Sequence, residues 1–436
     1  MNLKLMLEES YFHSYAYSYP HKMAYRELTE KVQIKDAWRD ENKEALFLYL
    51  HIPFCEMRCG FCNLFTMTLP EKSLVTAYLD QLEKEAILSF EDLNSPGFAR
   101  IAVGGGTPSF LNERELERFF GILTGHLKTG SVPSSFEISP ATINKEKLEI
   151  LKNQGVTRIS MGIQSIIEEE AKNLGRPQKN EEVAKAIRLI KESGIEVMNL
   201  DLIYGAKGQS VENWKKSVNY VIENQAEEVF LYPLYVRPLT GLGKRKREEE
   251  DFRLELYRNG RDLLLENGYK QVSMRMFRKY PEEISKGPVY RCQEDGMLGL
   301  GAGARSYTTE LHYSSEYAVG RSGIKEIINN YVNLNRRDLF EINYGIYLNK
   351  EEQKRRYIIK SILHEEGLSK ARFKKLYHID PLDCLPQLNQ LFDLQMLEEN
   401  EDLLTLNQQG MEASDAIGPW LYSDATMDLI RKFELR

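Results

Sequence analysis

The chain has few cysteines, no long apolar run and no excess of positive charge. It holds only five cysteines in 436 residues. This small, odd number argues against a disulfide framework and favours a reducing compartment. The longest apolar stretches, 45–54 and 229–236, are well short of the about 20 residues that cross a bilayer. The first residues lack the apolar core of a signal peptide, so we expect a cytoplasmic protein with no membrane partner.

The charge balance also excludes a broadly basic surface. Lysine and arginine number 58 against 65 acidic residues, for a net charge of −7. We therefore expect no nucleic-acid partner. Hydrophobic residues make up 42% and charged residues 28%, which is typical of a folded globular chain. The length predicts two or three domains, or one large barrel with an appendage.

Six β-rich runs alternate with amphipathic helical segments over the first half of the chain. The runs are 45–52, 100–103, 135–138, 158–163, 196–203 and 228–236. The helical segments are 71–89, 113–126, 145–153, 180–192 and 210–223. Asn180 and Ser210 are predicted N-caps, and Gly194 lies just past a helix end. The alternation predicts an α/β fold with parallel strands, either an open doubly wound sheet or a partial barrel.

Two segments lie outside this alternation. Residues 1–44 are rich in tyrosine, and we expect them to form a partly ordered arm. The tyrosines of this segment are Tyr11, Tyr15, Tyr17, Tyr19 and Tyr25. Residues 45–320 would form the strand–helix domain, with a charged surface loop at 241–251. Residues 321–436 read as a C-terminal helical domain, and the short alternating stretch 403–406 predicts a β-wing.

Unusual polar residues and glycines follow successive predicted strands. In chain order they are Cys55, Cys59 and Cys62 after the first strand, Gly104, Gly105, Gly106 and Thr107 after the second, and Glu137, Gln164 and Asp201 on the next three. Ligands bind at the carboxyl ends of strands in parallel sheets and barrels. The sequence therefore predicts one site at this face.

The three clustered cysteines form a Cys-x3-Cys-x2-Cys loop without a fourth cysteine. Thiolates favour zinc, copper(I) or iron–sulfur centres. A cubane cluster held by three cysteines keeps one iron open for another ligand. A structural zinc site needs four ligands, and His51 is the candidate for the fourth. Thiols that bind nothing are the third interpretation.

The loop and its surroundings resemble a known family. A Cys-x3-Cys-x2-Cys loop after the first strand, with Phe61 before the last cysteine, is similar to the radical S-adenosylmethionine (SAM) superfamily. The string YLHIPFC at 49–55 and GGGTP at 104–108 resemble its HemN-like branch, which includes oxygen-independent coproporphyrinogen III oxidase. The resemblance implies a partial (β/α)6 TIM-type barrel followed by a helical, winged-helix-like domain.

The same resemblance implies the cofactors. Cys55, Cys59 and Cys62 would hold a [4Fe–4S] cluster, whose fourth iron binds SAM. Further SAM-site positions would be Tyr49, Phe61, Gly104, Gly105, Gly106, Thr107, Glu137, Gln164, Arg176 and Asp201. A reduced cluster would cleave SAM to a 5'-deoxyadenosyl radical that abstracts hydrogen from a small-molecule substrate. Flavodoxin or ferredoxin would donate the electron, and no acid–base catalytic residue is expected.

Departures from the branch pattern leave the reaction open. Leu64 stands where some members have a fourth cysteine, and Ser139 stands in place of an expected aspartate. The string YRCQEDG at 290–296 replaces the His-Asn and Tyr-Trp pattern of haem-chaperone relatives. Three functions remain: coproporphyrinogen oxidase-like oxidation, methyl transfer or cyclopropanation with two SAM molecules, and non-catalytic haem binding.

Basic residues indicate the substrate side. Arg237, Arg275 and Arg305 are candidates for binding carboxylates of a tetrapyrrole-like or otherwise acidic substrate. Each is equally a candidate for a structural ion pair. The arm around 19–26 lies where branch members contact substrate or a second SAM. The glycine-rich string 299–303 predicts a close backbone approach rather than a phosphate site. Cys292 is interpreted as a small buried hydrophobic residue, with a reactive thiol or a redox spectator as the alternatives.

Overall fold

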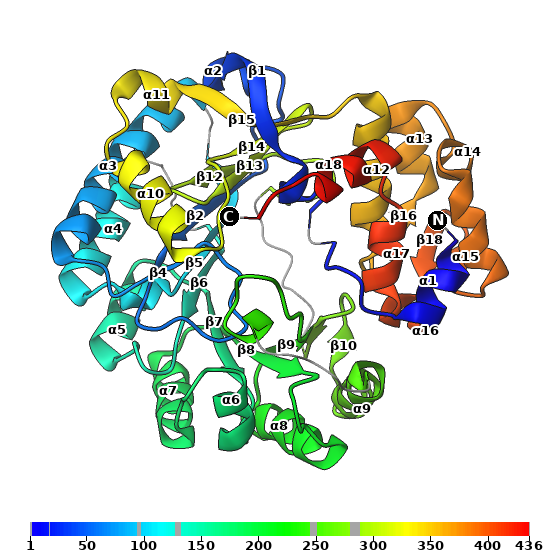
Figure 1. Cartoon of the computed structure of the whole chain (residues 1–436), viewed down its shortest axis with the longest axis horizontal. Helices are drawn as coiled ribbons and strands as arrows, with labels where there is room; N and C mark the ends of the chain where they lie inside the picture. The colour runs from blue at the N-terminus through cyan, green and yellow to red at the C-terminus, as the bar shows by residue number, and fades with distance from the viewer. Residues whose placement is uncertain are drawn as a thin grey trace.

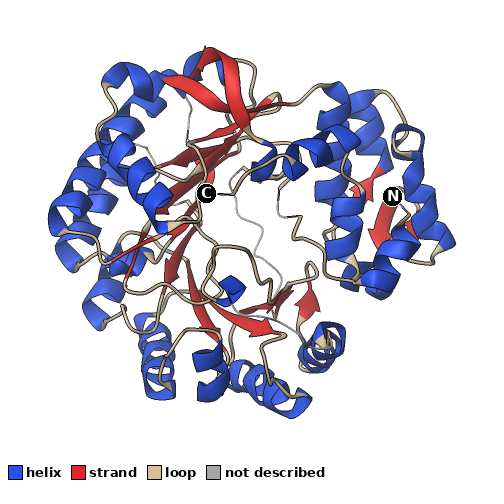
Figure 2. Cartoon of the chain, in the orientation of Figure 1, coloured by secondary structure: helices blue, strands red, loops and turns tan. Residues whose placement is uncertain are grey.

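A mixed sheet of 13 strands runs through the described part of the chain (Figures 1 and 2). The computed structural model describes residues 2–16, 18–93, 97–126, 132–244, 251–279 and 288–435. Tyr17 and most of the predicted charged loop, residues 245–250, lie outside them. The strand order is β1-β15-β14-β13-β12-β2-β5-β6-β7-β8-β9-β11-β10.

The middle of this sheet is the predicted parallel unit. Its strands are β2 (Leu46–Ile52), β5 (Phe98–Gly105), β6 (Ser134–Ile138), β7 (Arg158–Gln164), β8 (Val197–Tyr204) and β9 (Glu228–Pro233), each parallel to the next. The helices between them are α3 (Lys72–Leu93), α4 (Glu113–His126), α5 (Lys145–Asn153), α6 (Glu168–Asn173), α7 (Asn180–Ser193) and α8 (Val211–Glu223). Both sets of predictions are confirmed. The described strands form no closed ring, which agrees with a partial barrel.

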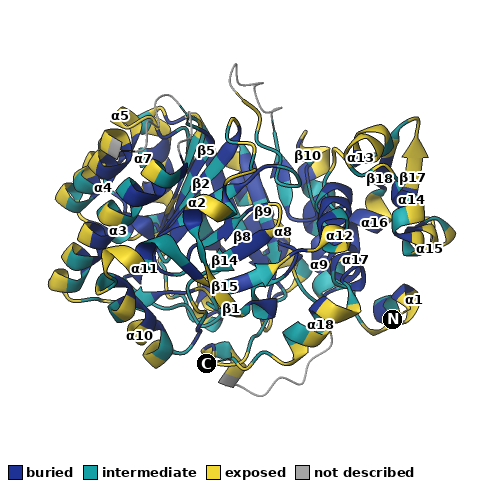
Figure 3. Cartoon of the chain, turned by 90° about the horizontal axis from the view of Figure 1, so that it is seen from above, coloured by how far each residue is buried: buried dark blue, intermediate teal, exposed yellow. Residues whose placement is uncertain are grey.

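Alternation along the strands gives the sheet two different faces. Leu48, Phe136 and Leu200 are fully buried under the helices. Tyr49 and Asp201, one position further along their strands, stay partly exposed. Figure 3 shows exposed residues on the outer sides of the covering helices and buried residues over the strands. Successive side chains point to opposite faces, so the inner face lines an open lumen.

The sheet extends beyond the predicted unit on both sides. The glycine-rich string begins within β12 (Met297–Leu300), which is parallel to β2. A Cβ on Gly301 would lie 2.5 Å from the Tyr78 hydroxyl, which confirms the predicted close approach. Further strands follow as antiparallel neighbours: β13 (Arg305–Tyr307), β14 (Leu311–Ser314), β15 (Glu341–Tyr347) and β1 (Arg26–Gln33) at one edge, and β11 (Met276–Arg278) and β10 (Lys270–Gln271) at the other.

The C-terminal region has a hydrophobic core of its own. It contains α12 (Lys350–Ile362), α13 (Lys370–Tyr377), α14 (Pro381–Cys384), α15 (Asn389–Asp393), α16 (Gln408–Glu412), α17 (Ser414–Trp420) and α18 (Asp424–Arg431). A small sheet of β16 (Leu368–Ser369), β18 (Leu403–Leu406) and β17 (Leu397–Asn400) includes the predicted wing strand. Helix α1 (Leu3–Glu9) packs into this region (Figure 1).

The arm is more structured than the tyrosine-rich pattern predicted. Its two ends belong to different parts of the fold, because α1 joins the C-terminal core and β1 joins the large sheet. Helices α10 (Arg321–Val332) and α11 (Arg336–Phe340) pack on α3, and β15 lies in the large sheet. The division of the chain at residues 44 and 320 stays a prediction.

The predicted helix ends are mostly confirmed. Ser210 accepts a hydrogen bond from the Asn213 amide, and Gly194 is left-handed at φ 68°. The prediction for Asn180 is wrong, because Lys179 is the N-cap and the Asn180 amide donates to the Ile166 carbonyl. No helix in the described ranges is long and apolar enough to cross a membrane.

Candidate cluster and cofactor site

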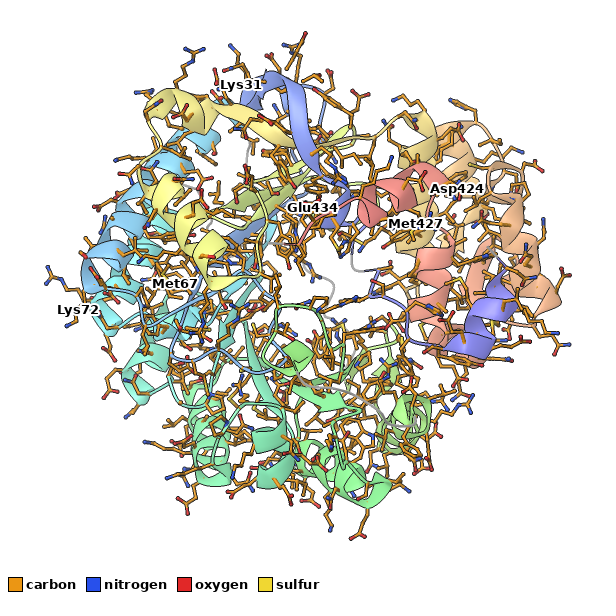
Figure 4. The ribbon with its side chains drawn as sticks, viewed as in Figure 1. Lys31, Met67, Lys72, Asp424, Met427 and Glu434 are labelled. Carbon is orange, nitrogen blue, oxygen red and sulfur yellow. The ribbon has the colours of Figure 1, made fainter. Side chains whose placement is uncertain are left out.

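Two short parallel strands pair with each other on either side of the cysteine loop. They are β3 (Phe54–Cys55) and β4 (Met67–Thr68), and Met67 is labelled in Figure 4. The Leu69 amide donates to the Cys55 carbonyl at 3.0 Å, and the Cys62 amide donates to the Cys59 carbonyl at 3.1 Å. Cys59 and Cys62 both act electrostatically on Cys55, so the three thiols lie near one another.

Two of the three thiols have a polar neighbour from another segment of the chain. Cys55 Sγ lies 3.0 Å from Thr107 Oγ1, and the Arg176 guanidinium donates to Cys59 Sγ at 3.6 Å. Burial raises the pKa of Cys55 to about 12 and also raises the pKa of Cys59. Metal coordination removes such thiol protons, since a bound metal makes the thiolate the favoured form.

His51 does not complete a zinc site. Its Nε2 lies 2.9 Å from the Phe65 carbonyl oxygen and its Nδ1 lies 3.2 Å from the Tyr49 hydroxyl, so both ring nitrogens are engaged. No three His, Cys, Asp or Glu side chains in the described ranges converge to hold a single metal ion. A cubane does not need that convergence, because each thiolate binds a different iron. The three thiols therefore fit a [4Fe–4S] cluster with one open iron.

The glycine string at the end of β5 leaves no room for side chains. A Cβ on Gly104 would lie 2.8 Å from Glu137 Oε1, and one on Gly106 would lie 2.5 Å from the Phe54 carbonyl oxygen. Gly105 adopts φ +123°, and its amide donates to Glu137 Oε2 at 3.2 Å. These glycines thus allow β5 to lie against the start of the cysteine loop and against Glu137.

Two carboxyl groups share the inner face of the sheet. Burial, followed by the charge of Asp201, raises the pKa of Glu137 to about 7. Burial also raises the pKa of Asp201 to about 6, although Asn199 donates to Asp201 Oδ1 at 2.7 Å. The Glu137 carboxylate also acts on Tyr49 of β2, so the three predicted residues face one another.

The loop after β7 packs on the cysteine loop. Gln164 ends β7 with φ 60° at an irregularity in the β7–β8 ladder, which turns the chain out of the strand. The Gly60 amide donates to the Leu174 carbonyl at 3.0 Å, and a Cβ on Gly175 would lie 2.7 Å from the Gly60 Cα. This contact brings Arg176 to Cys59 and had no recognisable signal in the sequence.

Phe61 lies over the ends of β8 and β9. It packs on a small apolar cluster that includes Leu174, Ile203 and Leu234. Every residue predicted for the site therefore lies around the cysteine loop or on the inner face of the sheet beneath it.

Lys22 and His21 of the arm also reach this region. Lys22 Nζ lies 3.5 Å over the Tyr317 ring, and Cys62 acts on it electrostatically. Burial, followed by the nearby charges of Arg305 and Arg237, lowers the pKa of Lys22. Burial and the same two arginines, together with Lys22, lower the pKa of His21. Four basic side chains from three segments thus meet beside the cysteine loop.

The structure decides between the two alternatives for Arg275. It forms a buried ion pair with Asp415 of the distant C-terminal region and is not available to a substrate carboxylate. The interpretation of Cys292 as buried is wrong, because Cys292 is partly exposed.

Comparison with known proteins gives consistent results. Residues 49–221 match the model of the Radical SAM superfamily. Heme chaperone HemW of Bacillus subtilis is 28% identical over 371 residues, covering 83% of this chain and 95% of that protein. Oxygen-independent coproporphyrinogen III oxidase of Escherichia coli is 24% identical over 416 residues, covering 91% and 88%. The structure of coproporphyrinogen III oxidase (HemN) from Escherichia coli has the same fold, with a TM-score of 0.81 at 22% identity, covering 96% and 98%.

Proposed function

Because this chain is a radical SAM protein of the HemN-like branch, we propose that it is an enzyme that oxidises a small acidic substrate. Its cofactors are a [4Fe–4S] cluster and SAM. When bound and reduced, the cluster supplies the electron that cleaves SAM and so generates the radical that removes a substrate hydrogen atom. The observation that carries the proposal is that Arg176 contacts Cys59 of the cysteine loop and also acts on Asp201, which shares the inner face of the sheet with Glu137.

The chain's own residues would position the cofactors. Cys55, Cys59 and Cys62 hold the cluster, while Thr107 and Arg176 contact two of its ligands. The two oxygens of the Asp201 carboxylate suit two ribose hydroxyls of SAM. Glu137 suits the SAM amino group, because a carboxylate pairs with an ammonium. Gln164, Phe61, Tyr49 and the Gly104–Gly106 backbone complete the proposed SAM pocket.

The basic group of His21, Lys22, Arg237 and Arg305 supports an acidic substrate. Burial and the charges of Arg237 and Arg305 lower the pKa of Lys22 and of His21, and a bound carboxylate would favour the protonated form of both. Arginine also recognises carboxylates through two parallel hydrogen bonds. A tetrapyrrole-like acid is a member of this class, and flavodoxin or ferredoxin is the proposed electron donor.

We expect SAM affinity to rise with pH. The pKa of Glu137 is raised to about 7 and that of Asp201 to about 6, so both carboxyl groups lose protons as the pH rises through that range. Only the ionised forms accept hydrogen bonds on both oxygens. Titration calorimetry between about pH 6 and 8 should show the dissociation constant of SAM falling roughly tenfold. Asp201→Asn should flatten this dependence, whereas Asp393→Asn on exposed α15 should not.

A carboxylate probe tests the substrate side. The tetra-acid coproporphyrin III should bind the cluster-loaded protein, as measured by quenching of its fluorescence. Lys22→Met and Arg237→Met should each weaken binding roughly tenfold, since each removes a charge-assisted contact. The tetramethyl ester should bind weakly to all three proteins. Equal binding of ester and acid would contradict an acidic substrate class.

Product analysis separates the proposed function from its alternatives. Cluster-loaded protein is incubated anaerobically with SAM and a strong reductant, and products are measured by mass spectrometry. Equal amounts of 5'-deoxyadenosine and methionine support the proposal. S-adenosylhomocysteine in addition would indicate methyl transfer with two SAM molecules. The similarity to Heme chaperone HemW makes haem binding the second candidate function, and tight haem binding without SAM cleavage would favour it.

A further inference from the structure

A second cavity lies on the outer side of the sheet. Its volume is about 460 Å³, and it is bounded by β12–β15, by β1 and by helices α3, α10 and α11. This volume is in the range of small-molecule sites. Ser306 of β13 lines it, whereas Arg305 and Tyr307 on either side of Ser306 act on Tyr49 of the lumen. The cavity is thus separated from the cluster site by the sheet.

Glu85 of α3 lies at the inner end of this cavity. The Gly301 amide donates to its Oε2 at 2.8 Å, and the Tyr331 hydroxyl donates to the same oxygen at 2.7 Å. Its Oε1 receives no hydrogen bond from the described residues, and Glu85 lines the cavity. Burial raises the pKa of Glu85 to about 7, which is the response of a carboxyl group without a counter-charge. A buried carboxylate with one unused oxygen favours a cationic partner.

The rest of the lining has the same sign of charge. The acidic side chains are Glu85, Glu316, Glu326, Asp338 and Glu341, and the basic one is Lys31, labelled in Figure 4. Lys31 is already paired with Glu341 at 2.6 Å. The lining therefore carries more acidic than basic side chains, although Glu341 is also paired with Arg337 at 3.0 Å.

The remaining lining is apolar. Ile327, Leu334, Leu339 and Ile342 border the cavity beside the rings of Tyr313 and Tyr331. A bare metal ion would not use such a surface, and no three His, Cys, Asp or Glu side chains converge on one point within the described residues. An organic cation suits both the acidic and the apolar side chains of the lining, because its ammonium group pairs with a carboxylate and its carbon skeleton covers apolar side chains.

We propose that this cavity is a binding site for a small primary amine with an apolar body, whose ammonium group donates to Glu85 Oε1. The site is independent of the cluster and of the proposed reaction. The segment that lines it meets the cluster region only on the far side of the sheet. There Gly301 packs on the His51 carbonyl and Gly303 packs on Phe65. Amine binding and SAM binding should therefore occur together on one molecule.

The test uses the full chain with its cluster, and phenethylamine and tryptamine as probes in titration calorimetry. At least one probe should bind with a stoichiometry of one, and SAM should not displace it. Glu85→Gln should weaken binding at least tenfold. Its amide oxygen can still accept from Gly301 and Tyr331, so the variant should keep the melting temperature within a few degrees of the parent. Phenethyl alcohol, which lacks the charge, should not bind.

Two further variants make the result decisive. Glu117→Gln removes an exposed carboxylate of α4 and should bind the amine like the parent. Leu339→Trp fills the cavity without removing charge and should also abolish binding. The proposal is overturned if neither amine binds the parent chain, or if binding survives Glu85→Gln unchanged.

Discussion

Replacing Cys55, Cys59 or Cys62 singly by alanine should remove the iron–sulfur cluster and, with it, SAM cleavage. Three thiolates are the whole protein share of the proposed donor set, so the loss of one leaves two irons without a protein ligand. Even outer-shell changes at metal sites cost about 10- to 100-fold in affinity, so the loss of a ligand should cost at least as much. Iron and sulfide analysis after anaerobic reconstitution measures the effect directly.

Cys292→Ala and Cys384→Ala are the matched controls. Both cysteines are free and partly exposed, like Cys59 and Cys62, but neither lies in the cysteine loop. Both variants should reconstitute to the iron content of the parent protein. Full cluster loading of the Cys59→Ala variant would contradict the assignment of Cys59 as a cluster ligand.

Asp415→Ala should strongly destabilise the protein. Arg275 of the segment before β11 and Asp415 of α17 form an ion pair in which their side chains are 3% and 1% exposed. The Tyr235 hydroxyl also donates to Asp415, and the Arg275 guanidinium lies 3.8 Å over the Tyr15 ring. Removing Asp415 leaves a buried cation without its partner, which costs about 3–5 kcal/mol of unfolding free energy. Urea denaturation followed by circular dichroism measures the loss.

A surface pair provides the comparison. Arg431 and Asp428 of α18 are 60% and 59% exposed and lie 3.0 Å apart. Asp428→Ala should change the unfolding free energy by less than about 1 kcal/mol, since exposed pairs contribute little. If Asp415→Ala were as mild as Asp428→Ala, the C-terminal region would not be held to the barrel by this ion pair. Limited proteolysis should also cut the Asp415→Ala variant faster than the parent between the barrel and the C-terminal region.

The parallel unit and the site face could be predicted because they are local in sequence. Each of the six strands is a short apolar run between amphipathic helices, and most site residues lie on a strand or in the loop that follows it. The parallel arrangement then brings Cys55, Glu137 and Asp201 to one face without further information. The HemN-like resemblance added the cofactors to that geometry.

The rest could not be predicted because it depends on pairing between distant segments. Strand β1 is formed by a polar stretch of the arm and pairs with β15, more than 300 residues later. Strand β12 ends in the glycine-rich string, whose glycines have little strand propensity of their own. The role of Arg275 stayed open between substrate binding and an ion pair because its partner, Asp415, lies in a helix of the C-terminal region. Asn180 was assigned as a cap because the adjacent Lys179 gives no capping signal.

The central claim is that the Cys55–Cys62 loop holds a [4Fe–4S] cluster with one iron open to SAM. Electron paramagnetic resonance of the reconstituted, reduced protein before and after adding SAM tests it most directly. We expect the signal of a reduced [4Fe–4S] cluster, with a change in its g-values when SAM is added. We also expect Asp201→Asn to require more SAM for the same change. A cluster signal that SAM leaves unchanged, or zinc in place of iron, would contradict the account.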